Sequence, residues 1–340
     1  MGATAVLGDP GPDFCGSGGG APALPRQDDE VQPVRQALAD AIRSRVGGPS
    51  GEDHARRLFE SDGPRWFGPD RPIRRVHGDA SVFVGALRAL LLQSLHPLAM
   101  AGVADHSDFR HDPWGRLQRT ARFLTATTYG NAAQSEAACA TVRRVHLRVR
   151  GVAPDGRPYD ANDPHLLTWV HIAEVDSFLA AYQRFGAGAL TPADADGYVE
   201  DMARVAGALG VPDPPRSVAA LRSRLASYGP ELAGTPAARD AARFLLLQPP
   251  VPLAARGPYT LLGATAVALL PWRAKVMLRI PPLPVNEAVI IRPAGRALVA
   301  GMRWALTTGA PDTDTNTESE MIPDSAAPPL ATRGPGSLVG

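Results

Sequence analysis

Hydrophobic positions recur at helical spacing through almost all of the middle of the chain. Runs of alternating β-branched residues do not exceed about five residues, and there is no Asn-Gly hairpin turn. We therefore predict an all-α protein with a single multi-helix globular domain. The segments expected to be helical are 31–46, 80–103, 112–129, 131–150, 163–185, 192–209, 215–227, 235–247, 255–270 and 285–306.

Several helix ends are marked by single residues. Three starts combine a capping side chain with a proline at the first helical position, where the missing N–H costs no hydrogen bond. They are Asp112-Pro113, Asp163-Pro164 and Thr191-Pro192. Gly130, Gly151 and Gly186 follow apolar periodic runs, and we expect each to form a left-handed C-terminal cap.

Both ends of the chain differ from this helical middle. Residues 1–27 and 309–340 are rich in Gly, Pro, Ala, Asp, Ser and Thr and show no hydrophobic period. Such segments cannot bury enough apolar surface to offset the entropy lost on ordering. We predict two disordered tails around one domain at residues 28–308.

Composition narrows the class of protein. Hydrophobic residues make up 44% and charged residues 20%, as in ordinary globular proteins, and the net charge of +1 gives no overall field that would attract nucleic acid. The N-terminus has no signal-peptide pattern, and Cys15 and Cys139 lie in different contexts, so we expect a cytoplasmic protein without a disulfide.

The most apolar window, Tyr259 to Trp272, is shorter than the ~20 residues that a spanning helix needs. We interpret it as a buried helix and expect no transmembrane segment. A helix lying in a membrane interface is the alternative, so peripheral membrane contact stays open.

Two histidines lie on apolar helix faces. His146 shares a face with Cys139, Val142, Val145 and Val149, so it should point inward. A hydrogen-bonded core histidine is the commoner reading of such a position, and a ligand is the alternative. His171 falls on the inward stripe of the segment 163–185, between Leu167, Val175 and Phe178.

An arginine and a threonine share the inward face of the segment 112–129. Arg116 and Thr120 are four residues apart, with Phe123 on the same side. A buried guanidinium needs an anionic partner. That partner is either a carboxylate such as Glu174 or Asp176, or the acid group of a cofactor.

Familiar chemical motifs are otherwise absent from the sequence. The stretch from Asp105 to His111 is rich in metal-binding residue types, but it precedes a helix cap and is more typical of a solvated loop. There is no dinucleotide or Walker loop, no Gly-x-Ser-x-Gly, no His-Glu-x-x-His and no Cys-x-x-Cys-His. The best support for nucleotide, serine-hydrolase, zinc-protease and covalent-haem functions is therefore missing.

Six spaced blocks between about residues 60 and 280 do occur in a known order. They are Trp66-Phe67-Gly68, the run from Gly78-Asp79-Ala80 to His96-Pro97, Gly102 to Ser107, Arg116-x-x-x-Thr120, Val142 to Gly151, and Leu167 to His171. In this order they resemble the catalytic domain of MpaB-type oxygenases and rubber-cleaving latex-clearing proteins, also known as domain of unknown function 2236.

This resemblance implies an all-helical protein with a non-covalent haem b. By motif, His146 would be the iron ligand, and Arg116 and Thr120 would lie beside the cofactor, with a propionate as the partner of Arg116. His171 becomes a candidate for the distal side. The rubber oxygenases carry a lysine beside the threonine that can bind the iron, whereas this chain has Arg119. Arginine does not deprotonate, so the resting distal site should differ.

The resemblance therefore suggests a haem-dependent oxygenase that uses dioxygen to attack an apolar small molecule or polymer. The expected point of attack is a carbon–carbon double bond, as in an isoprenoid-like compound. On that view His146 holds the metal, Arg116 and Thr120 bind the cofactor, and Arg119 and His171 stand on the reacting side. Two alternatives stay open: a non-catalytic haem sensor or carrier, and a metal-free helical lipid-binding protein. The sequence does not identify a redox partner.

Overall fold

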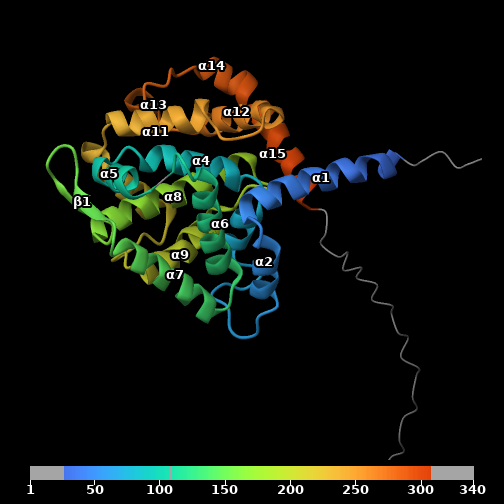
Figure 1. The fold of residues 1–340 in the computed structure, drawn as a ribbon, viewed down its shortest axis with the longest axis horizontal. Helices are drawn as coiled ribbons and strands as arrows, with labels where there is room; N and C mark the ends of the chain where they lie inside the picture. Colours follow the sequence, from blue (N-terminus) through green and yellow to red (C-terminus); the bar gives the residue numbers. More distant parts are fainter. Residues whose placement is uncertain (1–26, 108, 308–340) are drawn as a thin grey trace, which may run out of the picture. The chain divides into compact units, whose positions relative to one another are not determined.

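A computed structural model describes residues 27–307 apart from Asp108 (Figure 1). The tails predicted at 1–27 and 309–340 lie outside these residues, except for Gln27, which begins the first helix. The described part is one all-α domain with a single two-stranded hairpin, so the predicted fold class is confirmed.

The first half of the domain contains seven helices and the hairpin. They are α1 (Gln27–Gly47), α2 (Gly51–Phe59), α3 (Pro72–Gly78), α4 (Val82–Gln93), α5 (Pro97–His106), α6 (Pro113–Tyr129), α7 (Ala132–His146), β1 (Arg150–Val152) and β2 (Pro158–Asp160). The second half contains α8 (Pro164–Phe185), α9 (Pro192–Leu209), α10 (Val218–Ser227), the 3-10 turn η1 (Gly229–Glu231), α11 (Pro236–Leu247), α12 (Leu253–Ala268), α13 (Trp272–Met277), α14 (Pro284–Asn286), the π-helical turn η2 (Glu287–Ile291) and α15 (Arg292–Leu306).

Helix α8 forms the centre of the domain because it is apolar almost all round. Trp169, Ile172 and Val175 are among the largest fully buried side chains. Helix α4 lies on one side of α8 and is covered in turn by α12, while α9 packs on α8 and also contacts α7 (Figure 1).

The close approach of α4 to α8 depends on one glycine and one arginine. A Cβ at Gly85 would lie 2.5 Å from Cδ1 and 3.0 Å from Cα of Phe178, so only glycine fits there. One turn further on, buried Arg88 donates to Ser177 Oγ at 2.7 Å and forms an ion pair with Asp176 at 2.7 Å. The two helices are thus joined by both packing and charge.

The N-terminal caps are as predicted. Asp112, Asp163 and Thr191 each accept a hydrogen bond from a backbone N–H in the first turn of the helix that follows. The left-handed C-terminal caps that we predicted do not form. Gly130 and Gly186 have φ of −68° and −62°, and Gly151 lies in β1. Glycine is required at the first two positions for another reason, because a Cβ there would lie 2.5 and 2.6 Å from the carbonyl oxygens of Ala126 and Tyr182.

Three predicted helices differ clearly from those in the structure. The segment 285–306 consists of α14, the π-helical turn η2 and α15. The segment 80–103 is not one helix but two, α4 and α5, which meet at a bend of 106°. Pro97 lacks an N–H and forces His96 into an extended conformation, with ψ of 115°, so the helix cannot continue. The segment 131–150 ends at His146, because Arg150 to Val152 pair with Pro158 to Asp160 as a hairpin.

The short helices α2, α3 and α13 were not predicted, since six to nine residues carry too little periodicity. No single helix in the described part of the chain is long and apolar enough to span a membrane; the bent pair α4–α5 meets the criterion only when the two helices are joined.

Candidate functional site

Arg116 and His146 lie on two consecutive helices, α6 and α7. Helices α6 and α7 pack on each other and are joined at Gly130 and Asn131. Each of the two residues lies roughly 20 Å along its helix from that turn, at 1.5 Å per residue. Both residues therefore lie far from the turn that joins the two helices.

Two further segments meet these ends. Arg116 Nη1 donates to Oγ of Ser107, directly after α5, at 2.6 Å. The hairpin that follows α7 is fastened to α5, since Tyr159 Oη donates to Asp105 Oδ2 at 2.5 Å and His106 Nε2 lies 3.2 Å from the carbonyl oxygen of Arg150. The C-terminal end of α5 thus contacts both the start of α6 and the hairpin that follows α7.

His146 has the properties of a free ligand. The residue is half-buried, and its Nδ1 is fully buried without a hydrogen-bond partner in the part of the chain that the structure describes. Burial lowers the pKa of His146, and the charge of Asp160 opposes this only in part. The imidazole is thus held neutral, which is the form that binds a metal ion.

The predicted apolar face around His146 is only partly correct. Cys139 is buried, and burial raises the pKa of its thiol to about 11, but Val145 is 56% exposed. The last turn of α7 is therefore more accessible than the periodicity suggested.

Arg116 is half-buried and makes no ion pair with any described carboxylate. Burial, followed by the charge of Arg119, lowers its pKa. Of the two acids considered as partners from the sequence, Asp176 pairs with Arg88, and Glu174 makes no ion pair with a described residue. An anionic partner for Arg116 is therefore still required by the cost of burying a charge.

Arg119 and Thr120 are more exposed than Arg116 and His146. The hydroxyl of Thr120 donates to the carbonyl oxygen of Arg116 at 3.1 Å, and the residue is exposed. Arg119 is also exposed and pairs with the capping Asp112 at 3.2 Å. Their roles beside a cofactor stay predictions.

His171 is buried as predicted, in the interior of the domain. Its Nε2 has no hydrogen-bond partner among the described residues, and burial lowers its pKa to about 4. One turn along α8, burial raises the pKa of Glu174 to about 7. Two titratable groups next to each other on one helix face are thus both held neutral by burial at pH values between these two pKa values.

A histidine that the sequence analysis did not select lies in the same interior. His77 on α3 contacts Thr128 Oγ1 through Nδ1 at 2.8 Å and Tyr198 Oη through Nε2 at 3.3 Å, and burial lowers its pKa to about 3. The pKa of Tyr198 is raised by burial and by the charge of Glu174. His77 would have been selected from the sequence only if the short helix α3 had been predicted.

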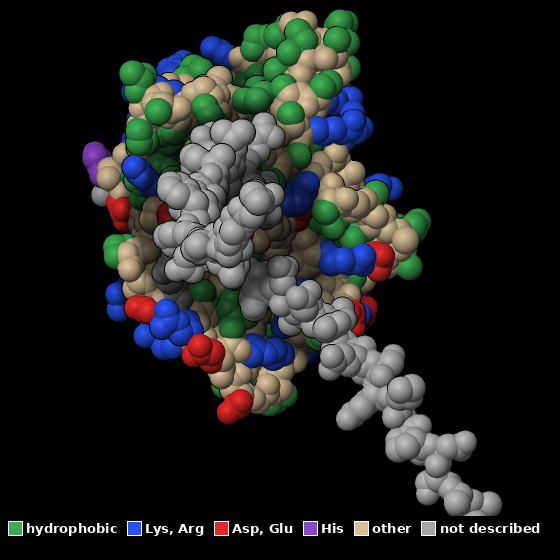
Figure 2. Space-filling view, turned by 90° about the vertical axis from the view of Figure 1, so that its right-hand side faces the viewer, with side chains coloured by type: hydrophobic (Ala, Val, Ile, Leu, Met, Phe, Trp, Pro, Cys, Tyr) green, Lys and Arg blue, Asp and Glu red, His purple; other side chains and the backbone are tan. Residues whose placement is uncertain are grey.

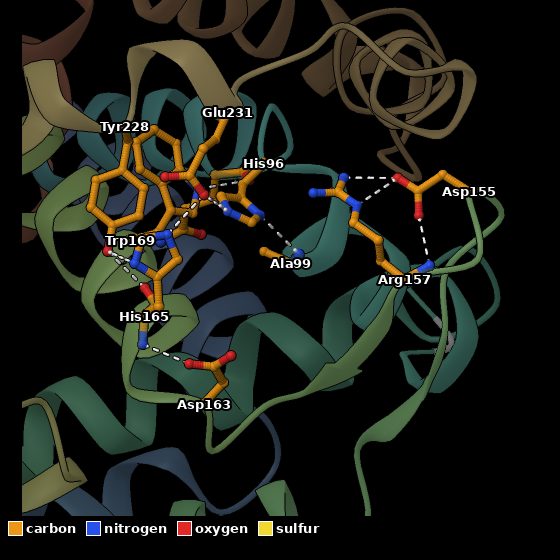
Figure 3. Close-up of polar contacts among 10 residues, drawn as sticks. His96, Ala99, Asp155, Arg157, Asp163, His165, Trp169, Tyr228 and Glu231 are labelled. Carbon is orange, nitrogen blue, oxygen red and sulfur yellow. Dashed lines mark hydrogen bonds and ion pairs between the residues drawn. The ribbon is translucent and has the colours of Figure 1, made fainter.

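A second group of polar side chains, also missed, joins the starts of α5 and α8 to η1 (Figure 3). Glu231 Oε2 lies 2.8 Å from Nε2 of His165 and 3.4 Å from Nε2 of His96. One ligand atom from each of these three residues lies within 4.8 Å of the others. His165 also stacks on Tyr228, with ring centroids 4.5 Å apart.

The hydrogen bonds around this group decide which atoms carry protons. His96 Nδ1 accepts the N–H of Ala99 at 3.4 Å, so a neutral His96 carries its proton on Nε2, toward Glu231 (Figure 3). Burial raises the pKa of Glu231, but the hydrogen bonds and charges of His165 and His96 outweigh it and lower the pKa. The arrangement is an ionised carboxylate held by imidazole donors, and His96 would have to lose its Nε2 proton before it could bind a metal ion.

The described part of the chain is thus an all-helical domain in which Arg116 and His146 lie near the C-terminal end of α5 and the hairpin, and His171 lies in the interior. Residues 74–304 match the family model described as ER-bound oxygenase mpaB/B'/Rubber oxygenase, catalytic domain, and the chain belongs to this family. The resemblance read from the six sequence blocks is thereby confirmed. No curated protein and no solved structure matches the chain.

Proposed function

We propose that this member of the oxygenase family is haem b-dependent, with His146 as the iron ligand, and that it oxidises an apolar substrate with dioxygen. The observation that carries this proposal is the half-buried imidazole of His146, whose Nδ1 has no described partner; Arg116 on the neighbouring helix is a half-buried guanidinium that has no described acid as its partner. An imidazole nitrogen and an arginine are the donors that an iron and a haem propionate require.

In this proposal each residue has a limited task. His146 binds the iron as a neutral imidazole, and Arg116 holds a propionate while Ser107 orients its guanidinium. When bound, the haem supplies the binding and activation of dioxygen. His171, neutral and without a partner on Nε2, is the donor or acceptor available for the distal side.

The substrate class follows from the family and from the interior. The family description includes a rubber oxygenase, which acts on an apolar polymer by its name, and we propose an apolar substrate with a carbon–carbon double bond for this chain as well. An apolar interior also keeps water from a reactive site.

The test is the absorption spectrum and pyridine haemochrome of the protein as purified, compared with His146→Ala. We expect haem b in the parent and its loss in the variant, with helical circular dichroism unchanged in both. His165→Ala is the control, because this exposed histidine belongs to the separate group with Glu231 and should not affect haem content.

Three other outcomes contradict the proposal in different ways. Full haem content with an unchanged spectrum in His146→Ala would show that another residue binds the iron, with His171 as the first candidate. A low-spin spectrum that His171→Ala converts to high-spin indicates a sensor or carrier. A colourless protein that does not take up added haem indicates the metal-free lipid-binding alternative.

A further inference from the structure

The segment from α13 to η2 presents an unusual number of apolar side chains to solvent. Six large apolar residues within this segment are each more than half exposed, although soluble proteins rarely group so many. We name them the apolar tip: Trp272, Val276, Leu283, Val285, Val289 and Ile290.

A buried ion pair holds the apolar tip in shape. Nζ of Lys275, the only lysine of the chain, lies 2.6 and 2.7 Å from the two carboxylate oxygens of Glu287, and both side chains are largely buried. Glu287 also accepts the N–H of Leu283 at 3.4 Å. The pair connects α13 to η2 across the loop, so the exposed apolar residues are positioned by the fold.

The charges around the apolar tip are of one sign. Between residues 241 and 307, Glu287 is the only acidic residue, and it is used internally. We use the name arginine rim for five of the exposed or half-exposed arginines that carry no ion pair to a described residue: Arg273, Arg279, Arg292 and Arg296, with Arg184 from the end of α8. Burial lowers the pKa of Arg184, and so do the charges of Arg296 and Arg292, which shows that these three guanidinium groups crowd together.

Several arginines elsewhere on the domain are paired with acids, although others, such as Arg116, are not. Arg75, Arg110, Arg157 and Arg224 each form an ion pair with an aspartate. In the upper part of Figure 2, where Figure 1 places α12 to α14, green and blue side chains lie together and no red side chain is visible. The lack of acids is thus a property of this face and not of the whole chain, whose net charge is +1.

We propose that the apolar tip and the arginine rim form a docking face for the surface of a bilayer containing anionic phospholipid. Apolar side chains and a tryptophan insert into the interface, and arginines bind the lipid phosphates around them. An acidic protein partner would meet the rim but not six exposed apolar residues, and a second copy of this face would bring arginines against arginines. This proposal does not depend on the proposed oxygenase reaction, although it would bring the domain to where apolar compounds dissolve.

The test is flotation of the full-length protein with vesicles of phosphatidylcholine, with and without 30 mol% phosphatidylglycerol. We expect binding to the anionic vesicles that weakens with salt. Arg296→Gln and Arg273→Gln should each lower the partition coefficient about fivefold, and Val285→Asp should lower it more than tenfold.

Matched controls are Val34→Asp and Arg224→Gln. Val34 on α1 is 68% exposed against 71% for Val285, and Arg224 lies away from the apolar tip. Brominated lipids should quench the tryptophan fluorescence of the parent and much less that of Trp272→Phe. Because Trp272 and Val285 are exposed, their replacement should leave the unfolding midpoint unchanged, which separates lost binding from lost folding.

Several results would overturn the proposal. Equal binding to neutral and anionic vesicles would show that the arginine rim does not contribute to binding. Binding that Val34→Asp weakens as much as Val285→Asp removes the role of the apolar tip. A dimer in solution that Val285→Asp dissociates, without vesicle binding by the parent, assigns the face to a second copy of the chain.

Discussion

Replacing Glu174 by glutamine should stabilise the protein above pH 7 and leave its stability near pH 4 unchanged. Burial raises the pKa of Glu174 from the ordinary 4.5 to about 7. A carboxyl group with a raised pKa favours folding fully below pH 4.5, and this contribution is lost as the pH rises from 4.5 through 7. At about 1.4 kcal/mol per pKa unit, the loss is on the order of 3 kcal/mol.

His171 and His77 act on the opposite side of the pH scale. Their pKa values, lowered to about 4 and about 3, contribute stability that is present above pH 6.5 and lost as the pH falls toward those values. Since both histidines remain in Glu174→Gln, the difference between the variant and the parent isolates the glutamate.

The assay is denaturant unfolding of both proteins as purified, followed by circular dichroism from pH 4 to pH 8.5. Glu136→Gln, which changes an exposed glutamate on α7, is the control and should show no such dependence on pH. A difference between Glu174→Gln and the parent that is the same at every pH would refute the reasoning, because the glutamate would then titrate alike in the folded and unfolded states.

Two further predictions concern packing and cofactor binding. Gly85→Ala should cost about 1–3 kcal/mol of unfolding free energy, because its Cβ would meet Phe178. Gly207→Ala, with open space around it on α9, should be neutral or stabilising. Thermal unfolding compares the two variants, and equal midpoints would contradict the prediction for Gly85. Arg116→Leu should weaken haem retention against a competing apo-acceptor by about 2–5 kcal/mol and Thr120→Val by about 0.5–1.5 kcal/mol. An Arg116→Leu variant that holds haem as tightly as the parent but unfolds earlier would make Arg116 a structural residue.

Local signals were sufficient where a single residue decides the conformation. Asp112, Asp163 and Thr191 cap their helices because a side-chain oxygen followed by proline acts within one turn. The same local reasoning was incomplete at Pro97, where the apolar period continues through the proline and hides the bend between α4 and α5. Gly130 and Gly186 do follow the ends of their helices as predicted, but glycine is required there by a neighbouring carbonyl oxygen and not by a positive φ.

The sequence by itself determined the helical class, the helix over 163–185, the burial of His171 and the family, because these depend on periodicity and on blocks whose order is read along the chain. Only the tertiary structure decided that Arg116 has no described acid beside it, that Nδ1 of His146 has no described partner, and that His96, His165 and Glu231 meet. Contacts between residues far apart in the chain depend on how helices cross, and periodicity tells which face of a helix is buried but not which side chain it faces.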